Sequence, residues 1–191
     1  MSDRAYPALT PERAEQVFLA LEEELRASRA VFELVVIGGS ALQALGLIDR
    51  ATRDVDVMAL VHGAGLIPAD PLPDALVAAA DRVARDFGLP EGWLNAGPSD
   101  LVRLGMPAGF LERVTTRQLG PSLTVHFASR YDQIHFKLYA MVDQGAGRHE
   151  MDLRALDPDR DSCLLRPGGL GRTILLWGSE GSFSPSCRTW V

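Results

Sequence analysis

The feature that most constrains the fold is an apolar run that stops at two glycines. The run FELVVI occupies Phe32–Ile37, and the residues GGS follow directly. Its length and its β-forming residues predict a buried strand, and the residues after the glycines predict a short helix over Ser40–Leu45. A second apolar run predicts another strand over Val55–Val61. A strand, a helix and a strand in this order indicate an α/β or α+β domain.

The rest of the chain, up to about residue 160, also shows periodic apolar spacing. Thr10 with Pro11 is a favourable helix start, and Gly88 is a favourable helix end. We therefore expect one domain over residues 1–160. Its further elements are predicted as helices over Pro11–Arg26, about Leu76–Phe87 and about Tyr131–Val142, a strand over Leu123–Phe127, and short elements near Leu101–Leu104 and Phe110–Val114.

Composition and charge exclude several classes of protein. The 191 residues are 47% hydrophobic and 23% charged, as in ordinary globular proteins. No apolar run approaches the roughly 18 residues of a membrane span, and the first residues lack the apolar core of a signal peptide. We therefore expect a cytoplasmic protein with no membrane contact. A net charge of -6 gives no general electrostatic footprint for nucleic acids, although a local basic face stays open.

The cysteines and histidines do not predict a metal centre. Cys163 and Cys187 form no CxxC pair, and His62, His135 and His149 lack metal-ligand spacing with a second histidine or cysteine. We expect these three histidines at surface or capping positions.

The stretch from Val36 to Val57 combines a phosphate-binding pattern with a cation-binding pattern. Glycines after a strand let the backbone approach a ligand, and the start of a helix favours an anion. Asp54 and Asp56 alternate with valines, so both carboxylates are predicted on one face of a strand, ~7 Å apart. A divalent ion would relieve their repulsion, and Mg²⁺ favours a few carboxylates plus substrate phosphates. The pattern indicates a nucleoside triphosphate, although a plain turn and a solvated edge strand would also produce it.

Two motifs together resemble the nucleotidyltransferase superfamily with the polymerase-β-like fold. The first is GGS, a helix, and then R-x-T-x-D-x-D over Arg50–Asp56. The second is DQIHFKLYAMVDQGAGRHEMDLRAL, where Lys137, Arg148 and Asp152 match a helical lysine, a later basic residue and an aspartate that opens the next helix. The resemblance covers about Val35–Leu156. It is strongest toward the abortive-infection type toxin nucleotidyltransferases and related small uncharacterised bacterial proteins.

This resemblance implies a polymerase-β-like fold with a short mixed sheet flanked by helices. It implies that Asp54 and Asp56 hold Mg²⁺ on an NTP, while an acceptor hydroxyl attacks the α-phosphorus and pyrophosphate leaves. The acceptor is an RNA, a protein or a small molecule, and nothing in the sequence selects among them.

The resemblance also implies roles for the residues around the aspartates. Gly38, Gly39 and Ser40 would cradle the triphosphate through backbone N–H groups and the serine hydroxyl, with Thr52 and Arg53 beside the nucleotide.

Two residues of the second motif receive roles in the same way. Lys137 would add a positive charge at the phosphates, and Asp152 would accept a proton or hold a metal-bound water.

One part of the family pattern is missing. The resembling enzymes add a third carboxylate on a neighbouring strand, and the stretch SLTVHFA contains none. His126 is the polar residue there that could face the site, although a lone strand histidine is more often a surface or hydrogen-bonded residue. Glu112 or Asp132 would serve only if loops bring them in. A two-ion site therefore lacks an evident ligand. Two classes of function stay open: a Mg²⁺-dependent enzyme, or a catalytically reduced nucleotide-binding or partner-binding module of the same fold.

The residues from about 161 onward differ from the rest of the chain. RPGGLGRTILLWGSEGSFSPSCRTWV has no sustained period and is rich in glycine and serine, which is typical of a flexible tail. Codon degeneracy also permits an amphipathic, helix-forming peptide in a shifted frame from Arg166 onward. We therefore expect a frameshift between about Asp159 and Leu165, and an aberrant or disordered tail over residues 161–191.

Overall fold

The computed structural model describes residues 6–144 and 148–158, and it divides the chain into two compact units. The sheet unit comprises the residues up to Arg103 together with Thr115–Phe127, and the helical unit comprises Leu104–Val114 with the residues from Ala128 onward. The tail predicted over residues 161–191 lies outside the described residues.

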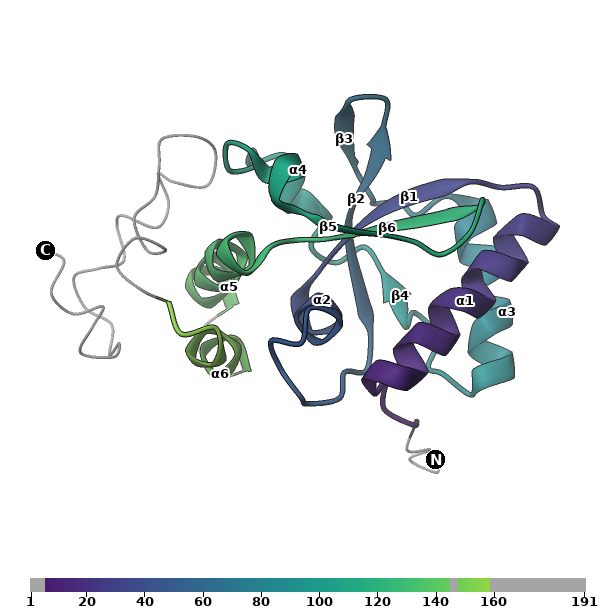
Figure 1. The fold of residues 1–191 in the computed structure, drawn as a ribbon, viewed down its shortest axis with the longest axis horizontal. Coiled ribbons are helices and arrows are strands. Elements are labelled where there is room, and N and C mark those ends of the chain that lie inside the picture. Colours follow the sequence, from purple (N-terminus) through teal and green to yellow (C-terminus); the bar gives the residue numbers. More distant parts are fainter. Residues whose placement is uncertain (1–5, 145–147, 159–191) are drawn as a thin grey trace, which may run out of the picture. The chain divides into compact units, whose positions relative to one another are not determined.

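A mixed, open sheet forms the centre of the sheet unit (Figure 1). Its order is β3-β2-β1-β6-β5, and β4 pairs with β2. The β1/β6 and β2/β4 pairs are parallel, and the other pairs are antiparallel. The described part of the chain is therefore an α/β protein. The strands are β1 (Phe32–Ile37), β2 (Val55–His62), β3 (Gly65–Pro68), β4 (Leu94–Asn95), β5 (Thr115–Gln118) and β6 (Leu123–Phe127).

The helices of the sheet unit are α1 (Pro11–Ala27), α2 (Gly38–Ala44) and α3 (Asp74–Phe87), with a 3₁₀ turn, η1 (Ser99–Val102). Thr10 caps α1, since its hydroxyl accepts a hydrogen bond from the Arg13 N–H at 3.3 Å. Gly88 ends α3 in the left-handed conformation, as a glycine after a helix commonly does. Figure 1 shows α1 and α3 lying side by side.

The main core lies between one face of the sheet and these two helices. Alternate strand residues point into it, because side chains on a strand alternate between its faces. Leucine, valine and alanine recur at helical spacing on α1 and α3, so each helix turns one apolar face to the same core. The residues of this cluster include Leu34, Val36, Val55, Val57, Leu123 and Val125 from the strands, and Val17, Leu21, Leu25, Leu76 and Val83 from the helices.

The helical unit contains α4 (Phe110–Arg113), α5 (Arg130–Gln144) and α6 (Arg148–Ala155). Ser129 starts α5, since its hydroxyl accepts the Asp132 N–H at 3.2 Å and its carbonyl accepts the Gln133 N–H at 2.9 Å. Phe110 and Phe136 pack edge to face with ring centres 6.0 Å apart. The helices α5 and α6 contact one another.

The strongly periodic elements were predicted well. The strands Phe32–Ile37 and Leu123–Phe127 are present with the predicted bounds, and the long helices differ by a few residues at their ends. The short strands β3, β4 and β5 were not predicted. None of the described helices has both the length and the apolarity that a membrane crossing requires.

His135 corrects one sequence expectation, because it is buried rather than exposed. It lies on α5 with 1% of its surface exposed, and its Nδ1 lies 2.8 Å from the Tyr131 carbonyl oxygen. A carbonyl oxygen only accepts, so this nitrogen carries the proton of the neutral ring. Burial lowers the pKa of His135 below its ordinary value of 6.5, because the charged form loses its hydration.

This burial predicts a defined loss of stability in acid. Well above pH 6.5 the ring is neutral in both the folded and the unfolded chain, so it adds no pH dependence there. Below pH 6.5 the unfolded chain binds the proton first, so the free energy of unfolding falls with pH. The measurement is denaturant unfolding between pH 7.5 and pH 5.5, compared with His135→Asn, which stays neutral. The variant is expected to lose part of the pH slope, whereas the exposed control His62→Asn keeps it; equal slopes in all three proteins would contradict the prediction.

Candidate functional site

The structure places the Gly-Gly-Ser turn directly against the Asp-x-Asp pair. A Cβ added to Gly38 would lie 2.4 Å from Oδ2 of Asp56, closer than any real side-chain contact. Gly38 also has a positive φ of 76°, which only glycine adopts at little cost. The position therefore requires glycine both for its backbone conformation and for the approach to the carboxylate.

An irregularity in strand pairing brings Gly38 close to Asp56. Along β1 and β2, Val35 pairs with Ala59, but Val36 pairs with Val57, so the register shifts between these two positions. Ile37 then lies opposite Asp56 instead of one residue further along β2. A bulge of this kind re-aims the side chains that follow it. Here it brings the residue after β1 to the carboxylate of Asp56.

Arg50 adds a positive charge to the same turn. A Cβ at Gly39 would lie 3.4 Å from Nη2 of Arg50 and 2.8 Å from Cγ2 of Thr52. Thr52 is buried, and its backbone exchanges hydrogen bonds of 2.7 and 3.0 Å with Leu9. Arg53, named above as a nucleotide residue, is exposed. Of the two arginines in the motif, Arg50 is thus the one placed beside the glycines.

The two aspartates occupy the start of β2 with partial exposure. Asp54 directly precedes the strand, whereas Asp56 is its second residue, and each is half-buried. Asn95 of β4 lies beside Asp56 in the sheet, and its Nδ2 donates to Oδ1 of Asp56 at 3.2 Å. The Asn95 Oδ1 accepts the Gly97 N–H at 2.9 Å, which fixes the orientation of the amide. Sequence reasoning missed Asn95, because a two-residue strand carries no periodic signal.

His126 is a hydrogen-bonded strand residue, the setting that a lone strand histidine more often has. Its strand, β6, pairs with β1 and not with β2. The ring lies 2.8 Å from the Thr116 hydroxyl through Nδ1 and 3.4 Å from Glu33 through Nε2. The residue beside Asp56 on a neighbouring strand is therefore an amide, Asn95, rather than a histidine or a third carboxylate.

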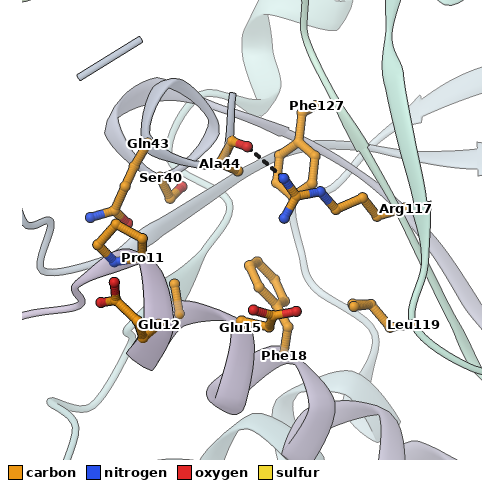
Figure 2. A pocket seen from close by; sticks show the side chains of 11 residues that line it. Pro11, Glu12, Glu15, Phe18, Ser40, Gln43, Ala44, Arg117, Leu119 and Phe127 are labelled. Atoms are coloured by element: carbon orange, nitrogen blue, oxygen red, sulfur yellow. Dashed lines mark hydrogen bonds between the residues drawn. The ribbon is translucent and has the colours of Figure 1, made fainter. Parts of the chain in front are cut away.

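Ser40 belongs to a separate pocket. Its residue is 4% exposed, and its side chain lines a pocket of about 310 Å³ together with Glu12, Glu15 and Phe18 (Figure 2). Neither aspartate and neither glycine of the motif lines this pocket. The Ser40 hydroxyl thus has carboxylates as neighbours in that pocket, which is an unfavourable setting for a triphosphate.

Lys137 and Asp152 form a buried ion pair within the helical unit. Lys137 Nζ lies 2.7 Å from Oδ2 of Asp152, and the two side chains are 9% and 2% exposed. Lys137 lies on α5 and Asp152 in the middle of α6, so the expectation that Asp152 opens its helix is wrong. The pair has a structural role within this unit whatever its role toward a nucleotide.

The other carboxylates named for the third ligand have different settings. Asp132 is fully buried and accepts hydrogen bonds from Arg113 Nη2 and Ser129 Oγ at 2.6 and 2.5 Å. This hydrogen bond from the guanidinium raises the pKa of Arg113 above its ordinary value. Glu112 is exposed on α4. Asp132 is therefore occupied by an ion pair inside the helical unit.

Within residues 6–144 and 148–158, no three His, Cys, Asp or Glu side chains form a group able to hold a metal ion. No family model matches the chain, and neither does a curated protein or a solved structure. The resemblance to nucleotidyltransferases therefore rests on the two sequence motifs, and the geometry of the sheet unit is what supports a function.

Proposed function

We propose that the sheet unit binds a nucleoside triphosphate with Mg²⁺ beside Gly38 and Asp56, as part of a polymerase-β-like nucleotidyltransferase. The observation that carries the proposal is the contact between the Gly38 backbone and the Asp56 carboxylate. Because Gly38 has no side chain, the Asp56 carboxylate, a proposed metal ligand, lies directly against the turn whose backbone N–H groups would meet the phosphates. The reaction is transfer of NMP from the NTP to a hydroxyl of an RNA, a protein or a small molecule.

The donor set at this turn fits Mg²⁺. Mg²⁺ keeps several waters and takes one or two carboxylates plus phosphate oxygens, and Asp54 and Asp56 are two half-exposed carboxylates at one end of a strand. When bound, this ion neutralises charge that develops on phosphoryl oxygens. Asp54 and Asp56 would hold it, and Asn95 would keep the Asp56 carboxylate in one orientation through its 3.2 Å hydrogen bond.

The remaining residues of the turn bind and orient the triphosphate. Arg50 lies beside Gly39 and supplies a guanidinium, which pairs with phosphate in a planar, two-pronged geometry. Gly39 and Ser40 contribute through their backbone N–H groups, since the Ser40 hydroxyl lines a different pocket. The roles that the resemblance implies for Lys137 and Asp152 stay predictions, and the contact that the structure gives them is their ion pair within the helical unit.

One observation favours a second candidate function. The residue that pairs with Asp56 on β4 is Asn95, an amide and not a third carboxylate. An amide cannot take the proton from an attacking hydroxyl as a carboxylate does. The alternative is therefore a module that binds a nucleotide with Mg²⁺ and transfers nothing.

Binding is tested by thermal unfolding. Mg²⁺ with NTP is expected to raise the melting temperature more than NTP alone, because a ligand that binds only the folded chain stabilises it. At a ligand concentration of about 100 times Kd the gain is ~2.7 kcal/mol, or roughly 5–10 °C for a chain of this size. The variant Asp54→Asn/Asp56→Asn should lose the Mg²⁺-dependent part. The matched control Asp81→Asn/Asp86→Asn, on exposed positions of α3, should keep it.

Transfer is tested separately from binding. The purified chain is incubated with Mg²⁺ and α-labelled NTPs in the presence of cellular RNA or protein, and covalent label is measured. Label that appears with the chain and disappears with Asp54→Asn/Asp56→Asn supports the enzyme. A Mg²⁺-dependent thermal shift without label would support the binding module, and equal shifts in the variant and the chain would remove the metal site altogether.

A further inference from the structure

The pocket beside Ser40 is lined by polar, acidic and aromatic side chains from different elements. It has a volume of about 310 Å³, within the range of small-molecule sites, and is formed by α1, α2 and the β5–β6 hairpin. Figure 2 shows Ser40 and Gln43 on α2, Glu12, Glu15 and Phe18 on α1, and Phe127 of β6 beside Arg117. The phenylalanines, Phe18 and Phe127, meet edge to face with ring centres 6.3 Å apart.

Two buried oxygens in the α2 wall point to a ligand. Ser40 and Gln43 are each 4% exposed, and neither Ser40 Oγ nor Gln43 Oε1 has a hydrogen-bond partner among the described residues. The Gln43 amide nitrogen donates to the carbonyls of Leu9 and Arg50 at 3.0 and 3.3 Å, which fixes Oε1 as the remaining atom. Buried polar atoms nearly always have hydrogen-bond partners. Ser40 Oγ and Gln43 Oε1 therefore indicate a ligand group that donates hydrogen bonds.

The charges of the pocket select a cation. No described residue forms an ion pair with Glu12 or Glu15, and both carboxylates are exposed at the rim. The one guanidinium in the lining, that of Arg117, donates to the Ala44 carbonyl at 2.6 Å and lies 5.5 Å from the centre of the Phe127 ring. One of its N–H groups is therefore used by the protein, and two carboxylates against one guanidinium leave the lining with a net negative charge.

We propose that this pocket binds a small primary amine with an aromatic body. The ammonium group donates hydrogen bonds to Gln43 Oε1 and Ser40 Oγ and pairs with the carboxylates of Glu12 and Glu15. The aromatic body packs against Phe18 and Phe127. This inference goes beyond the proposed nucleotide function. Ser40 takes part in both, through its backbone N–H at the triphosphate and through its hydroxyl here, but no residue that would hold the metal lines the pocket.

Calorimetric titration of the full chain tests the ligand class. The probes are 2-phenylethylamine, the neutral 2-phenylethanol and the anionic 3-phenylpropionate, which share a benzyl group and differ in charge. The amine is expected to bind at least roughly tenfold more tightly than either analogue, because only the amine gains charge-assisted hydrogen bonds. Equal or tighter binding of the alcohol, tighter binding of the carboxylate at Arg117, or no binding of the amine would each overturn the proposal.

Variants of the rim test the location. Glu12→Gln/Glu15→Gln keeps the shape of both exposed side chains and removes their charge, so the amine is expected to bind roughly tenfold more weakly. Glu23→Gln is the matched control, since Glu23 is exposed on the same helix and does not line the pocket. Circular dichroism confirms folding of each variant. Unchanged amine binding in the double variant, or an equal loss in the control, would place the amine elsewhere and overturn the proposal.

Discussion

Lys137→Met is expected to lower the free energy of unfolding by about 3–5 kcal/mol, the usual effect of removing one partner from a buried ion pair. The substitution leaves the Asp152 carboxylate, 2% exposed, without the ammonium that lies 2.7 Å away. Lys137→Met/Asp152→Leu should recover most of the loss, because apolar groups can replace a buried pair at little cost. Denaturant unfolding followed by circular dichroism measures both variants.

A second pair on α6 provides the control. Arg154 and Glu150 lie 2.7 Å apart on the surface of the helix, so Arg154→Met should cost less than about 1 kcal/mol. A cost for Lys137→Met no greater than that of the control would contradict the prediction. The double variant also separates the two roles of Lys137. If it folds and still binds Mg²⁺ with NTP, the ion pair serves the fold; if it folds and binds no nucleotide, the pair also serves nucleotide binding.

Gly38→Ala is expected to be the most damaging single change at the candidate site. Its left-handed backbone costs a side chain about 1–2 kcal/mol, and the collision of the new Cβ with Asp56 adds roughly 1–3 kcal/mol. Gly46→Ala is the matched control, since Gly46 has φ 68° and no atom within 4 Å of the added Cβ. For Gly46→Ala, only the cost of the left-handed backbone applies. Denaturant unfolding of both variants gives the difference.

The collision itself is tested by a double-mutant cycle. Asp56→Ala removes the atoms that the new Cβ meets, so Gly38→Ala should cost about as much as Gly46→Ala in that background. The coupling between the two positions is then roughly 1–3 kcal/mol. If Gly38→Ala lowers the free energy of unfolding equally with Asp56 and with Asp56→Ala, the added Cβ does not collide with the carboxylate.

Local patterns were enough to predict the long elements. Phe32–Ile37 and Leu123–Phe127 are short, buried runs rich in β-forming residues, and α1 and α3 begin or end at residues that cap helices. β5 reads TTRQ and is exposed throughout, so nothing in its own residues distinguishes it from a loop. Its pairing with β6 makes it a strand.

The candidate site likewise contains some residues that local sequence patterns predict and others that only the tertiary structure identifies. The glycine turn and Asp54 with Asp56 follow from the order of residue types, since each is a signal within a few residues. Asn95 could not be predicted as their neighbour, because 39 residues separate it from Asp56 and only the parallel pairing of β4 with β2 joins them. The choice of Arg50 over Arg53 also depends on the path of the chain between α2 and β2.

By itself, the sequence determined the long strands and helices, and that a glycine turn follows one strand while two aspartates open another. Tertiary structure alone decided the contact of Gly38 with Asp56, which depends on the register shift between Val35 and Val36. It also decided that Ser40 faces Glu12 and Phe18. The physical reason is that periodicity reports whether one segment is buried, whereas register and facing depend on the segments that pair with it.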